Sequence, residues 1–357
     1  MKIIHCSDLH LDSPLGRNFT PAQAKTRNAE LCATFGRMVQ FARREQVEAV
    51  LLAGDLFDSG YASARTVEFV LDQIRNAPQV TFFYIRGNHD GGRDPFDGAV
   101  LPRNLKTFGP VWTSYPCGDA LITGMELGAG NREPSFSGPS LPADRCNIVM
   151  LHGDISGQPG PDHIPVQVLR GKHIDYLALG HLHSYQAGKL DNRGIFCYSG
   201  CLEGRGFDEC GEKGFVLLHV QPGGIRREFL PFAERTLHEI PVDITDAETA
   251  PRILARLRQS AESIPSKDLV KFVLTGTCTV QTQKDTAFME KMLAPEFFYV
   301  KLKDESRLQV DWESYEKDAS LRGEFVRLVM ASGKSEEDKK RIVSCGLGTL
   351  GGEEAVL

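Results

Sequence analysis

The chain has 357 residues, of which 41% are hydrophobic, and this composition indicates a folded globular protein with one large core and room for a smaller module. Its formal net charge of −6 argues against the overall basic surface that is typical of many nucleic-acid-binding proteins, although a metal-bearing groove can be locally positive inside an acidic protein. No apolar run reaches membrane-spanning length, and the chain opens in a predicted strand rather than a signal peptide. We therefore expect a cytoplasmic protein that does not enter a membrane.

The chain contains nine cysteines, an odd number, and no C-x-x-C pair. The closest grouping, Cys197, Cys201 and Cys210, lacks the spacing of a zinc site. We expect reduced thiols in a reducing compartment, and a structural metal at these cysteines is the alternative.

A short apolar run at residues 2–6 predicts a buried first strand, and Asp8 and His10 follow it. In extended backbone, two residues that flank a third point to the same face, so this D-x-H pair can offer one cation a carboxylate oxygen and an imidazole nitrogen. Taken alone, the pair is equally compatible with a solvated loop and a capping aspartate. A helix is predicted at about residues 21–45, where apolar residues recur with helical spacing.

A second apolar run at residues 49–53 stops at Gly54, and Asp55 and Asp58 follow. A buried strand of an α/β sheet delivers an acidic residue to its carboxyl edge in this way, and such sheets place their sites at that edge. Gly54 gives the backbone room to turn. One acidic residue at a strand end is weak evidence, but the same arrangement recurs at later strands.

Residues 79–85 are rich in β-branched and aromatic residues and predict a strand, which follows a predicted helix at about residues 62–76. The strand leads into Gly87-Asn88-His89-Asp90, the most specific tetrapeptide in the chain. An asparagine-rich turn would explain the glycine and the asparagine. It gives no reason for a histidine and an aspartate to follow.

Two further predicted strands also end in polar residues. Residues 147–151 lead into His152, and residues 176–179 lead into His181 and His183. The H-x-H pair repeats the same-face geometry with two imidazoles. A lone histidine is usually an ordinary core or surface residue, but four at strand ends, with two aspartates and an asparagine, indicate a metal site.

The remaining pattern divides the chain into three predicted parts. Strands are predicted at residues 195–198, 214–220 and 225–230, and from about residue 237 the order becomes strand, helix, strand, helix, strand. Two more amphipathic helical stretches follow. We predict a main domain at residues 1–235, an α+β module at 236–312 and C-terminal helices at 313–357.

Five motifs and their order along the chain resemble those of the calcineurin-like metallophosphoesterases. They are D-x-H, G-D-x-x-D, G-N-H-D, H-G-D and G-H-x-H. Residues 7–14 and 53–58 look like the SbcD branch of DNA-repair exonucleases, and within it the YhaO-type relatives. The resemblance is strong to about residue 230 and looser beyond. It implies an α/β fold in which two mixed β-sheets form a β-sandwich flanked by helices, with the α+β module and the terminal helices added.

The resemblance implies a metal-dependent phosphodiester hydrolase with two divalent ions, for which Mn²⁺ is expected and Fe²⁺ or Zn²⁺ are alternatives. Two ions at ~3.5–4 Å would activate a water for attack on phosphorus and neutralise the developing charge. The implied ligands of one ion are Asp8, His10, Asp55 and His183. Those of the other are Asp55, Asn88, His152 and His181.

The resemblance also implies roles for residues beside the ions. His89 would protonate or stabilise the leaving oxygen, and Asp90 would orient its imidazole. Asp58 either lies behind the ligands or caps a helix. Asp12 and Arg205 either line the substrate groove or are ordinary turn and surface residues.

As a nuclease subunit of this family, the protein would act on DNA together with a coiled-coil ATPase of the SMC type (an SbcC-type protein), and as a homodimer. The apolar faces of the terminal helices at residues 321–329 and 342–350 are candidates to dock the ATPase. Their alternative role is to pack on the α+β module.

Two other functions stay open. A related metallophosphoesterase that acts on small nucleotides or phosphoproteins would have the same ligands, but the residues at 12–14 and the C-terminal third argue against it. Ser59 and Gly60 follow Asp58 where related protein phosphatases carry an arginine. An inactive scaffold of the same fold would have lost ligands, whereas every ligand position here is filled.

Overall fold

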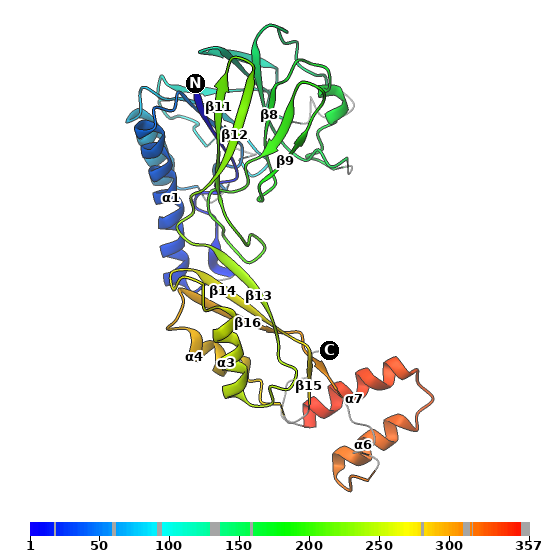
Figure 1. Cartoon of the computed structure of the whole chain (residues 1–357). Coiled ribbons are helices and arrows are strands. Elements are labelled where there is room, and N and C mark those ends of the chain that lie inside the picture. The colour runs from blue at the N-terminus through cyan, green and yellow to red at the C-terminus, as the bar shows by residue number, and fades with distance from the viewer. Residues whose placement is uncertain are drawn as a thin grey trace. The chain divides into compact units, whose positions relative to one another are not determined.

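The structure is a computed structural model of the chain, shown in Figure 1. It describes residues 1–350 except 18, 59–61, 91–94, 129–135, 158–159, 280–281, 310–314 and 316. The residues at 59 and 60 that argue against a protein phosphatase, and residues 351–357 of the predicted C-terminal helices, lie outside this described part. The chain divides into two compact units, Met1–Thr236 and Leu237–Leu357, and each is described by itself.

The first unit contains two six-stranded β-sheets with helices outside them (Figure 1). The first sheet has the order β12-β11-β1-β2-β3-β4, with strands at Gly224–Pro231, Gly214–Gln221, Lys2–Cys6, Ala49–Ala53, Thr81–Ile85 and Leu105–Thr107. The second has the order β5-β6-β7-β8-β10-β9, with strands at Thr113–Cys117, Ala120–Gly124, Cys146–His152, Tyr176–Gly180, Ile195–Tyr198 and Gln186–Lys189. This arrangement confirms the predicted fold class.

The two sheets pack face to face around one apolar core. Leu51 and Phe83 of the first sheet belong to the same buried cluster as Met150 and Ala178 of the second. Successive side chains of a strand point to opposite faces of its sheet. The face of each sheet that points away from this core must therefore be covered by other elements. Two helices, α1 (Pro21–Arg44) and α2 (Ala64–Arg75), accompany the first sheet.

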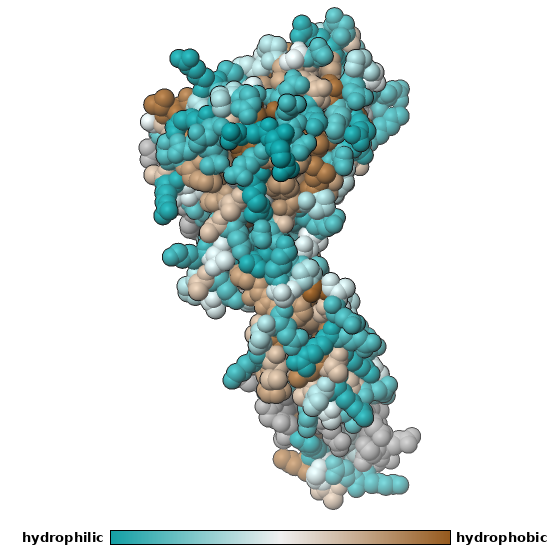
Figure 2. All heavy atoms as spheres, turned by 60° about the vertical axis from the view of Figure 1, so that its left-hand side comes forward, coloured by the Kyte–Doolittle hydropathy of each residue, from teal (hydrophilic) through white to brown (hydrophobic). Residues whose placement is uncertain are grey.

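The helix α1 covers the outer face of the first sheet. Its Phe41 packs on Phe215 of β11 with ring centroids 5.3 Å apart, whereas the neighbouring Val216 faces the core between the sheets. The helix begins at a capping box formed by Thr20 and Gln23. Figure 2 presents the side of this unit on which α1 lies in Figure 1. Hydrophilic side chains dominate this face.

The direction of the strands places the predicted ligands together. Strands β1, β2 and β3 are parallel neighbours, and so are β7 and β8. The carboxyl ends of parallel neighbours meet at one edge of a sheet. Every predicted ligand follows or ends one of these five strands.

The second unit contains a three-stranded parallel sheet, β13-β14-β16, which spans Leu237–Asp243, Leu269–Thr275 and Tyr299–Asp304. Helices α3 (Ala250–Ser260) and α4 (Thr286–Leu293) connect these strands, and a two-residue pair, β15 (Thr277–Cys278) with β17 (Arg307–Leu308), extends the unit. Gly276, whose φ of +84° breaks the extended conformation, separates β14 from β15.

The terminal helices of this unit are α6 (Leu321–Met330) and α7 (Glu336–Leu350). Val326 of α6 and Val343 and Leu347 of α7 form a small apolar cluster separate from the core of the α+β sheet. Leu321 and Leu328 stay 72% and 64% exposed. The two helices thus bury one face against each other and leave apolar side chains of α6 uncovered.

The structure also describes the cysteines and the lengths of the helices, which the sequence analysis considered. Each of the nine cysteines is free. None of the helices in the described residues is long and apolar enough to cross a membrane.

A buried ion pair fixes the segment between β10 and β11 to α1. The Arg27 guanidinium donates to the Glu203 carboxylate at 2.9 Å and to the Gly204 carbonyl at 2.9 Å, and the Thr34 hydroxyl donates to the other Glu203 oxygen at 2.7 Å. The side chains of Arg27 and Glu203 are each 1% exposed. The same segment carries Glu209, whose place in the site is described below.

We expect Glu203→Ala to lower the free energy of unfolding by about 1–3 kcal/mol, because it leaves buried donors of Arg27 and Thr34 without their acceptor while Glu30 stays paired with the guanidinium. Urea unfolding followed by circular dichroism measures this change. The control Glu212→Ala removes an exposed glutamate of the same segment and should stay within about 0.5 kcal/mol of the wild type. A loss below about 1 kcal/mol for Glu203→Ala would contradict the structural role of the pair.

Candidate metal centre

Four of the predicted ligands have a backbone conformation that non-glycine residues rarely adopt. The φ angles are +54° at Asp8, +46° at His10, +51° at Asp55 and +106° at His181. Backbone strain of this kind persists only where surrounding contacts enforce it, and it is concentrated at functional sites. The loops that follow β1, β2 and β8 are therefore shaped to aim these side chains.

Hydrogen bonds between the loops hold this conformation. The Asp8 amide donates to the Gly54 carbonyl at 3.0 Å, and the His10 amide donates to the Asp55 carbonyl at 3.0 Å. The His181 amide donates to both carboxylate oxygens of Asp8, at 3.0 and 3.2 Å. Loops from both sheets are thereby locked to one another at the ligand positions.

Two glycines permit the close approach of these loops. A Cβ atom at Gly180 would lie 2.0 Å from the Ala53 carbonyl oxygen, and one at Gly87 would lie 2.1 Å from Asp55 Oδ1. Both contacts are far shorter than a real Cβ atom tolerates, and both atoms are held in place by their surroundings. Glycine is thus required where the end of β8 meets β2 and where the loop after β3 meets Asp55.

One set of predicted ligands surrounds His152. Its Nδ1 donates to the Ala53 carbonyl at 2.9 Å, so the neutral ring carries its lone pair on Nε2. That Nε2 lies 2.9 Å from Asn88 Oδ1 and 3.3 Å from Asp55 Oδ2, and Asn88 Oδ1 lies 3.2 Å from His181 Nδ1. Four atoms that can each donate a lone pair therefore converge from four strand ends.

The other set surrounds His10. Its Nε2 lies 3.3 Å from His183 Nε2 and 3.6 Å from Asp55 Oδ2. His183 Nε2 lies 3.8 Å from Asp8 Oδ1. Asp55 Oδ2 is thus the atom that faces both sets, which is the geometry expected of a bridging carboxylate.

Glu209, which the sequence analysis did not select, fixes the orientation of His183. Its Oε1 accepts a hydrogen bond from His183 Nδ1 at 2.7 Å, so Nε2 of the neutral ring is left to face the centre. Metal-binding histidines commonly have such a carboxylate behind them. Arg205 donates to the same Glu209 oxygen at 2.6 Å and holds it in place. Burial opposes the charge of Glu209, but His183 and Arg205 lower the pKa of its carboxyl.

The electrostatics of the centre are strongly perturbed. Burial opposes protonation of His152, yet its hydrogen bond to Asp55 and the charge of Asp55 raise the pKa of His152 to about 9. Burial opposes ionisation of Asp55, but the same bond and the nearby imidazoles lower its pKa. Burial, and then the charge of Arg205, lower the pKa of His10 to about 3. Burial also raises the pKa of Asp8.

This donor set fits divalent metal ions. Lone pairs that face one another at 2.9–3.3 Å repel unless a proton or a cation lies between them. His10 Nδ1 is buried and has no hydrogen-bond partner among the described residues, so the polar contacts of this ring are made at Nε2, which faces the other predicted ligands. The candidate groups, each with ligand atoms within 4.8 Å, are Asp8-His10-His183, Asp8-Asp55-His152 and His10-Asp58-His89.

The structure corrects one predicted role. Asp90 was expected to orient His89, but its carboxylate instead accepts hydrogen bonds from the amides of Leu56, Phe57 and Gly87, at 3.2, 2.9 and 3.0 Å. Burial and the charge of Asp55 raise the pKa of Asp90 to about 6. Because this carboxylate is 1% exposed and occupied by three amides, it ties the loops after β2 and β3 together and does not reach the His89 ring.

Asp58 takes the place that Asp90 was expected to have. Its Oδ1 accepts a hydrogen bond from His89 Nδ1 at 3.0 Å, and its Oδ2 accepts one from the Ser13 hydroxyl at 2.8 Å. The His89 side chain is 48% exposed, and its ring lies against that of His10 with centroids 4.8 Å apart. His89 is therefore an oriented and accessible imidazole beside the centre.

The two predicted substrate residues occupy different environments. Asp12 accepts a hydrogen bond from the Ser63 amide at 2.8 Å and has a φ of +63°, so in this structure it joins the loop after β1 to the start of α2. Arg205 is largely buried behind His183, with its guanidinium also 3.4 Å from the Ser13 hydroxyl. Contact of either residue with a substrate stays a prediction.

A family model of the calcineurin-like phosphoesterases matches residues 1–185, which is more than half of the chain and includes every predicted ligand. The chain belongs to the calcineurin-like phosphoesterase family. Membership implies divalent metal ions, in agreement with the donor set. It does not identify the metal.

Among known proteins, this phosphoesterase is 29% identical over 301 residues to the uncharacterized metallophosphoesterase YhaO of Bacillus subtilis, with 78% of this chain and 72% of that protein covered. It is 25% identical over 286 residues to the DNA double-strand break repair protein Mre11 of Methanosarcina acetivorans, and 24% identical over 324 residues to that of Methanosarcina mazei. These matches cover 74% and 85% of this chain but only 44% and 50% of the Mre11 proteins.

Solved structures with a similar fold have low sequence identity. The protein TT1561 of Thermus thermophilus is 13% identical with a TM-score of 0.40, and the match covers 64% of this chain and 98% of that one. A dimetal phosphatase from Danio rerio is 12% identical with a TM-score of 0.42, covering 65% and 99%.

We expect Asp55→Asn to reduce the metal content at both positions together, because the neutral amide no longer balances the mutual repulsion of two cations. Metal analysis of the purified protein measures this. The control Asp119→Asn changes an exposed acidic residue in the turn between β5 and β6 and should leave the metal content unchanged. Full occupancy of two ions in Asp55→Asn would show that this carboxylate does not bridge them.

Proposed function

We propose that this phosphoesterase is a two-metal-dependent phosphodiesterase that cleaves DNA, as an exonuclease or endonuclease subunit of an SbcCD-like repair complex. The main support is the pair of ligand sets that share Asp55 Oδ2, with the exposed imidazole of His89 beside them. Such an arrangement suits displacement at phosphorus, since the ligand sets would hold the cations and His89 beside them offers a proton donor.

The donors suggest which ions bind. Asp8, His10, Asp55 and His183 would hold one ion, and Asp55, Asn88, His152 and His181 the other. Imidazole, carboxylate and amide ligands together suit Mn²⁺, Fe²⁺ or Zn²⁺ better than Ca²⁺. From the family resemblance we propose Mn²⁺, with Fe²⁺ or Zn²⁺ as alternatives. When bound, the ions supply Lewis-acid activation of a water and balance the charge on the phosphoryl oxygens.

His89 would protonate the leaving oxygen. Because Asp58 accepts the proton on Nδ1, the second nitrogen of the ring is the one that can carry a transferable proton. Burial opposes ionisation of Asp58, but the hydrogen bonds from Ser13 and His89 lower its pKa, so the carboxylate stays charged and stabilises an imidazolium. The backbone amide of His89 also donates to Asp55 Oδ1 at 2.8 Å, which fixes the residue relative to the centre.

DNA as the substrate is supported by the relatives that carry the name of DNA double-strand break repair proteins. A phosphoesterase for small nucleotides or phosphoproteins would use the same centre, so the substrate has to be tested directly.

The test uses end-labelled duplex and single-stranded DNA with Mn²⁺, beside bis(p-nitrophenyl) phosphate as a generic phosphodiester, each with and without EDTA. We expect metal-dependent cleavage of DNA. His89→Asn should keep both ions yet hydrolyse either substrate about 10²–10⁴-fold more slowly, the usual effect of removing a general acid.

The matched control for this experiment is His173→Asn, which changes an exposed histidine of the same unit and should behave like the wild type. Cleavage of the small phosphodiester without cleavage of either DNA would reject the nuclease assignment. Loss of a metal ion in His89→Asn would make this residue a ligand rather than the proton donor.

We also propose that the α6–α7 pair docks a coiled-coil ATPase of the SMC type. The two helices have their own small core, so they can present the exposed Leu321 and Leu328 without help from the sheet of the second unit. A homodimer is proposed from the family resemblance alone.

We expect the double variant Leu321→Asp/Leu328→Asp to lose co-purification with such an ATPase while it hydrolyses the small phosphodiester at the wild-type rate. Unchanged co-purification would move the docking surface elsewhere. The control Phe288→Asp changes an exposed apolar residue on α4, 46% exposed, and should retain the ATPase.

A further inference from the structure

Arg205 is attached to the carboxylate that orients His183. Its guanidinium donates to Glu209 Oε1 at 2.6 Å through Nη2 and at 3.1 Å through Nε, and its backbone amide donates to Glu209 Oε2 at 2.7 Å. Glu209 Oε1 in turn accepts the hydrogen bond from His183 Nδ1 at 2.7 Å. One residue therefore holds both oxygens of Glu209, and the carboxylate keeps a fixed direction behind the imidazole.

The Arg205 guanidinium also reaches the carboxylate that orients His89. Its Nη1 lies 3.4 Å from the Ser13 hydroxyl and 4.0 Å from Asp58 Oδ2, and the Ser13 hydroxyl donates to this Oδ2 at 2.8 Å. Asp58 Oδ1 accepts the hydrogen bond from His89 Nδ1 at 3.0 Å. A continuous series of polar contacts thus runs from the proposed metal ligand His183 to the proposed proton donor His89, with Arg205 in the middle.

These contacts are largely shielded from water. The side chains of Arg205 and Asp58 are each 15% exposed, and that of Glu209 is 3% exposed. Solvent and salt screen such charges less than they screen an exposed pair, so removal of the cation would leave two carboxylates to repel each other. An arginine suits this position, because its planar guanidinium has several N–H donors and can bind two acceptors at once.

The segment that carries Arg205 is itself held in place. The preceding Gly204 carbonyl accepts a hydrogen bond at 2.9 Å from the buried Arg27 of α1. The Glu209 amide donates to the Gly206 carbonyl at 2.9 Å and closes the segment on itself. The position of the guanidinium is therefore fixed by the fold and does not depend on a substrate.

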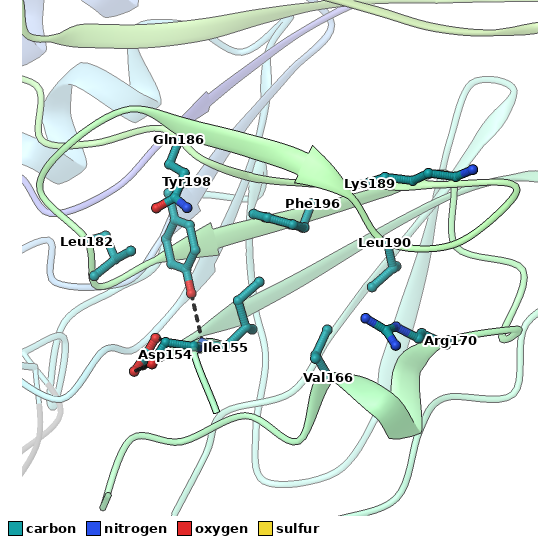
Figure 3. A pocket seen from close by; sticks show the side chains of 11 residues that line it. Asp154, Ile155, Val166, Arg170, Leu182, Gln186, Lys189, Leu190, Phe196 and Tyr198 are labelled. Carbon is teal, nitrogen blue, oxygen red and sulfur yellow. Dashed lines mark hydrogen bonds between the residues drawn. The ribbon is translucent and has the colours of Figure 1, made fainter. Parts of the chain in front are cut away.

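The loop that carries His183 also adjoins a cavity of about 210 Å³ (Figure 3). Leu182 lines this cavity together with residues of the loop after β7 and of β9 and β10, and His183 does not. The Tyr198 hydroxyl accepts a hydrogen bond from the Ile155 amide at 3.1 Å, which ties the end of β10 to the loop after β7. The cavity side thus holds the backbone of the loops, and the ring of His183 is oriented from the side of Glu209.

We propose that Arg205 is a positioning residue, which fixes His183 and His89 relative to each other through Glu209 and Asp58 and does not contact the substrate. The action on His89 rests on the proposed function, in which this histidine is the proton donor. The action on His183 concerns a proposed metal ligand and holds for hydrolysis of any phosphoester at this centre.

Kinetics of Arg205→Ala with bis(p-nitrophenyl) phosphate at saturating Mn²⁺ test the proposal. We expect kcat to fall about 10–100-fold, the range for loss of a group behind a metal ligand, and KM to change by less than about twofold. Arg205→Gln, which keeps more of the packing, should show the same loss. Arg205→Lys should recover only part of kcat, because its single nitrogen cannot bind both carboxylates in the same way. The control Arg103→Ala removes an exposed arginine of the same unit and should match the wild type.

A second measurement does not depend on activity. NMR spectra of the full chain with ¹⁵N-labelled histidines, recorded in EDTA, detect the Nδ1 protons that His183 and His89 donate to their carboxylates. Glu209→Ala and Asp58→Ala assign the two signals, because each removes one acceptor. Arg205→Ala should shift or broaden both signals while circular dichroism shows the wild-type fold, and the control variant should leave both signals unchanged.

Three results would overturn the proposal. A raised KM with an unchanged kcat in Arg205→Ala would make Arg205 a substrate contact. A wild-type kcat in Arg205→Lys would show that one positive charge suffices, and unchanged signals of both histidines in Arg205→Ala would show that the guanidinium does not hold them.

Failure of the proposed function gives a different result. DNA cleavage by the wild type is measured in parallel, and hydrolysis of the small phosphodiester without cleavage of DNA rejects only the nuclease assignment. Where the wild type hydrolyses neither substrate, the proposed function fails, and the histidine signals of Arg205→Ala still decide whether Arg205 positions the two rings.

Discussion

The structure of the first unit depends on one electrostatic constraint: lone pairs that face one another must share a proton or a cation. His152 Nε2, Asn88 Oδ1 and Asp55 Oδ2 approach to 2.9–3.3 Å, and the hydrogen bond from His152 Nδ1 to a carbonyl fixes which nitrogen carries the lone pair. Water cannot relieve this repulsion, because Asp55 is 1% and His152 5% exposed. The fold therefore builds an environment that stabilises positive charge at a defined point, which is what a metal centre requires.

Assembling these acceptors costs backbone strain, and the surrounding hydrogen bonds offset it. Asp8 and Asp55 have positive φ angles that each cost of order 1–3 kcal/mol in isolation. The amide of His181 donates to the Asp8 carboxylate from the other sheet, so each strained loop is held by a loop from a different strand. The ligand geometry is thus a property of the two packed sheets together, and no single motif contains it.

This dependence explains which parts were predictable from sequence. Strand ends and their polar residues follow local patterns, so the segments that carry Asp8, His10, His181 and His183 could be placed at one edge of a sheet. Short strands such as β4, with three residues, and β9, with four, have no clear alternation and were not predicted. Glu209 was missed because it lies in an irregular segment 26 residues after His183, where only the tertiary fold brings the carboxylate to the imidazole.

Sequence adjacency also misled the choice of Asp90 as the residue that orients His89. In a tight turn, consecutive side chains point in different directions, so three neighbours can serve three separate purposes. Asn88 faces the imidazoles of the centre, His89 turns outward to Asp58, and Asp90 turns inward to three amides. Because Asp90 binds the amides of Leu56 and Phe57, it fixes the loop of Asp55 to the loop of Asn88. Its buried carboxylate therefore fixes the spacing between Asp55 and Asn88, whereas the orientation of His89, the proposed proton donor, depends on Asp58, 31 residues away.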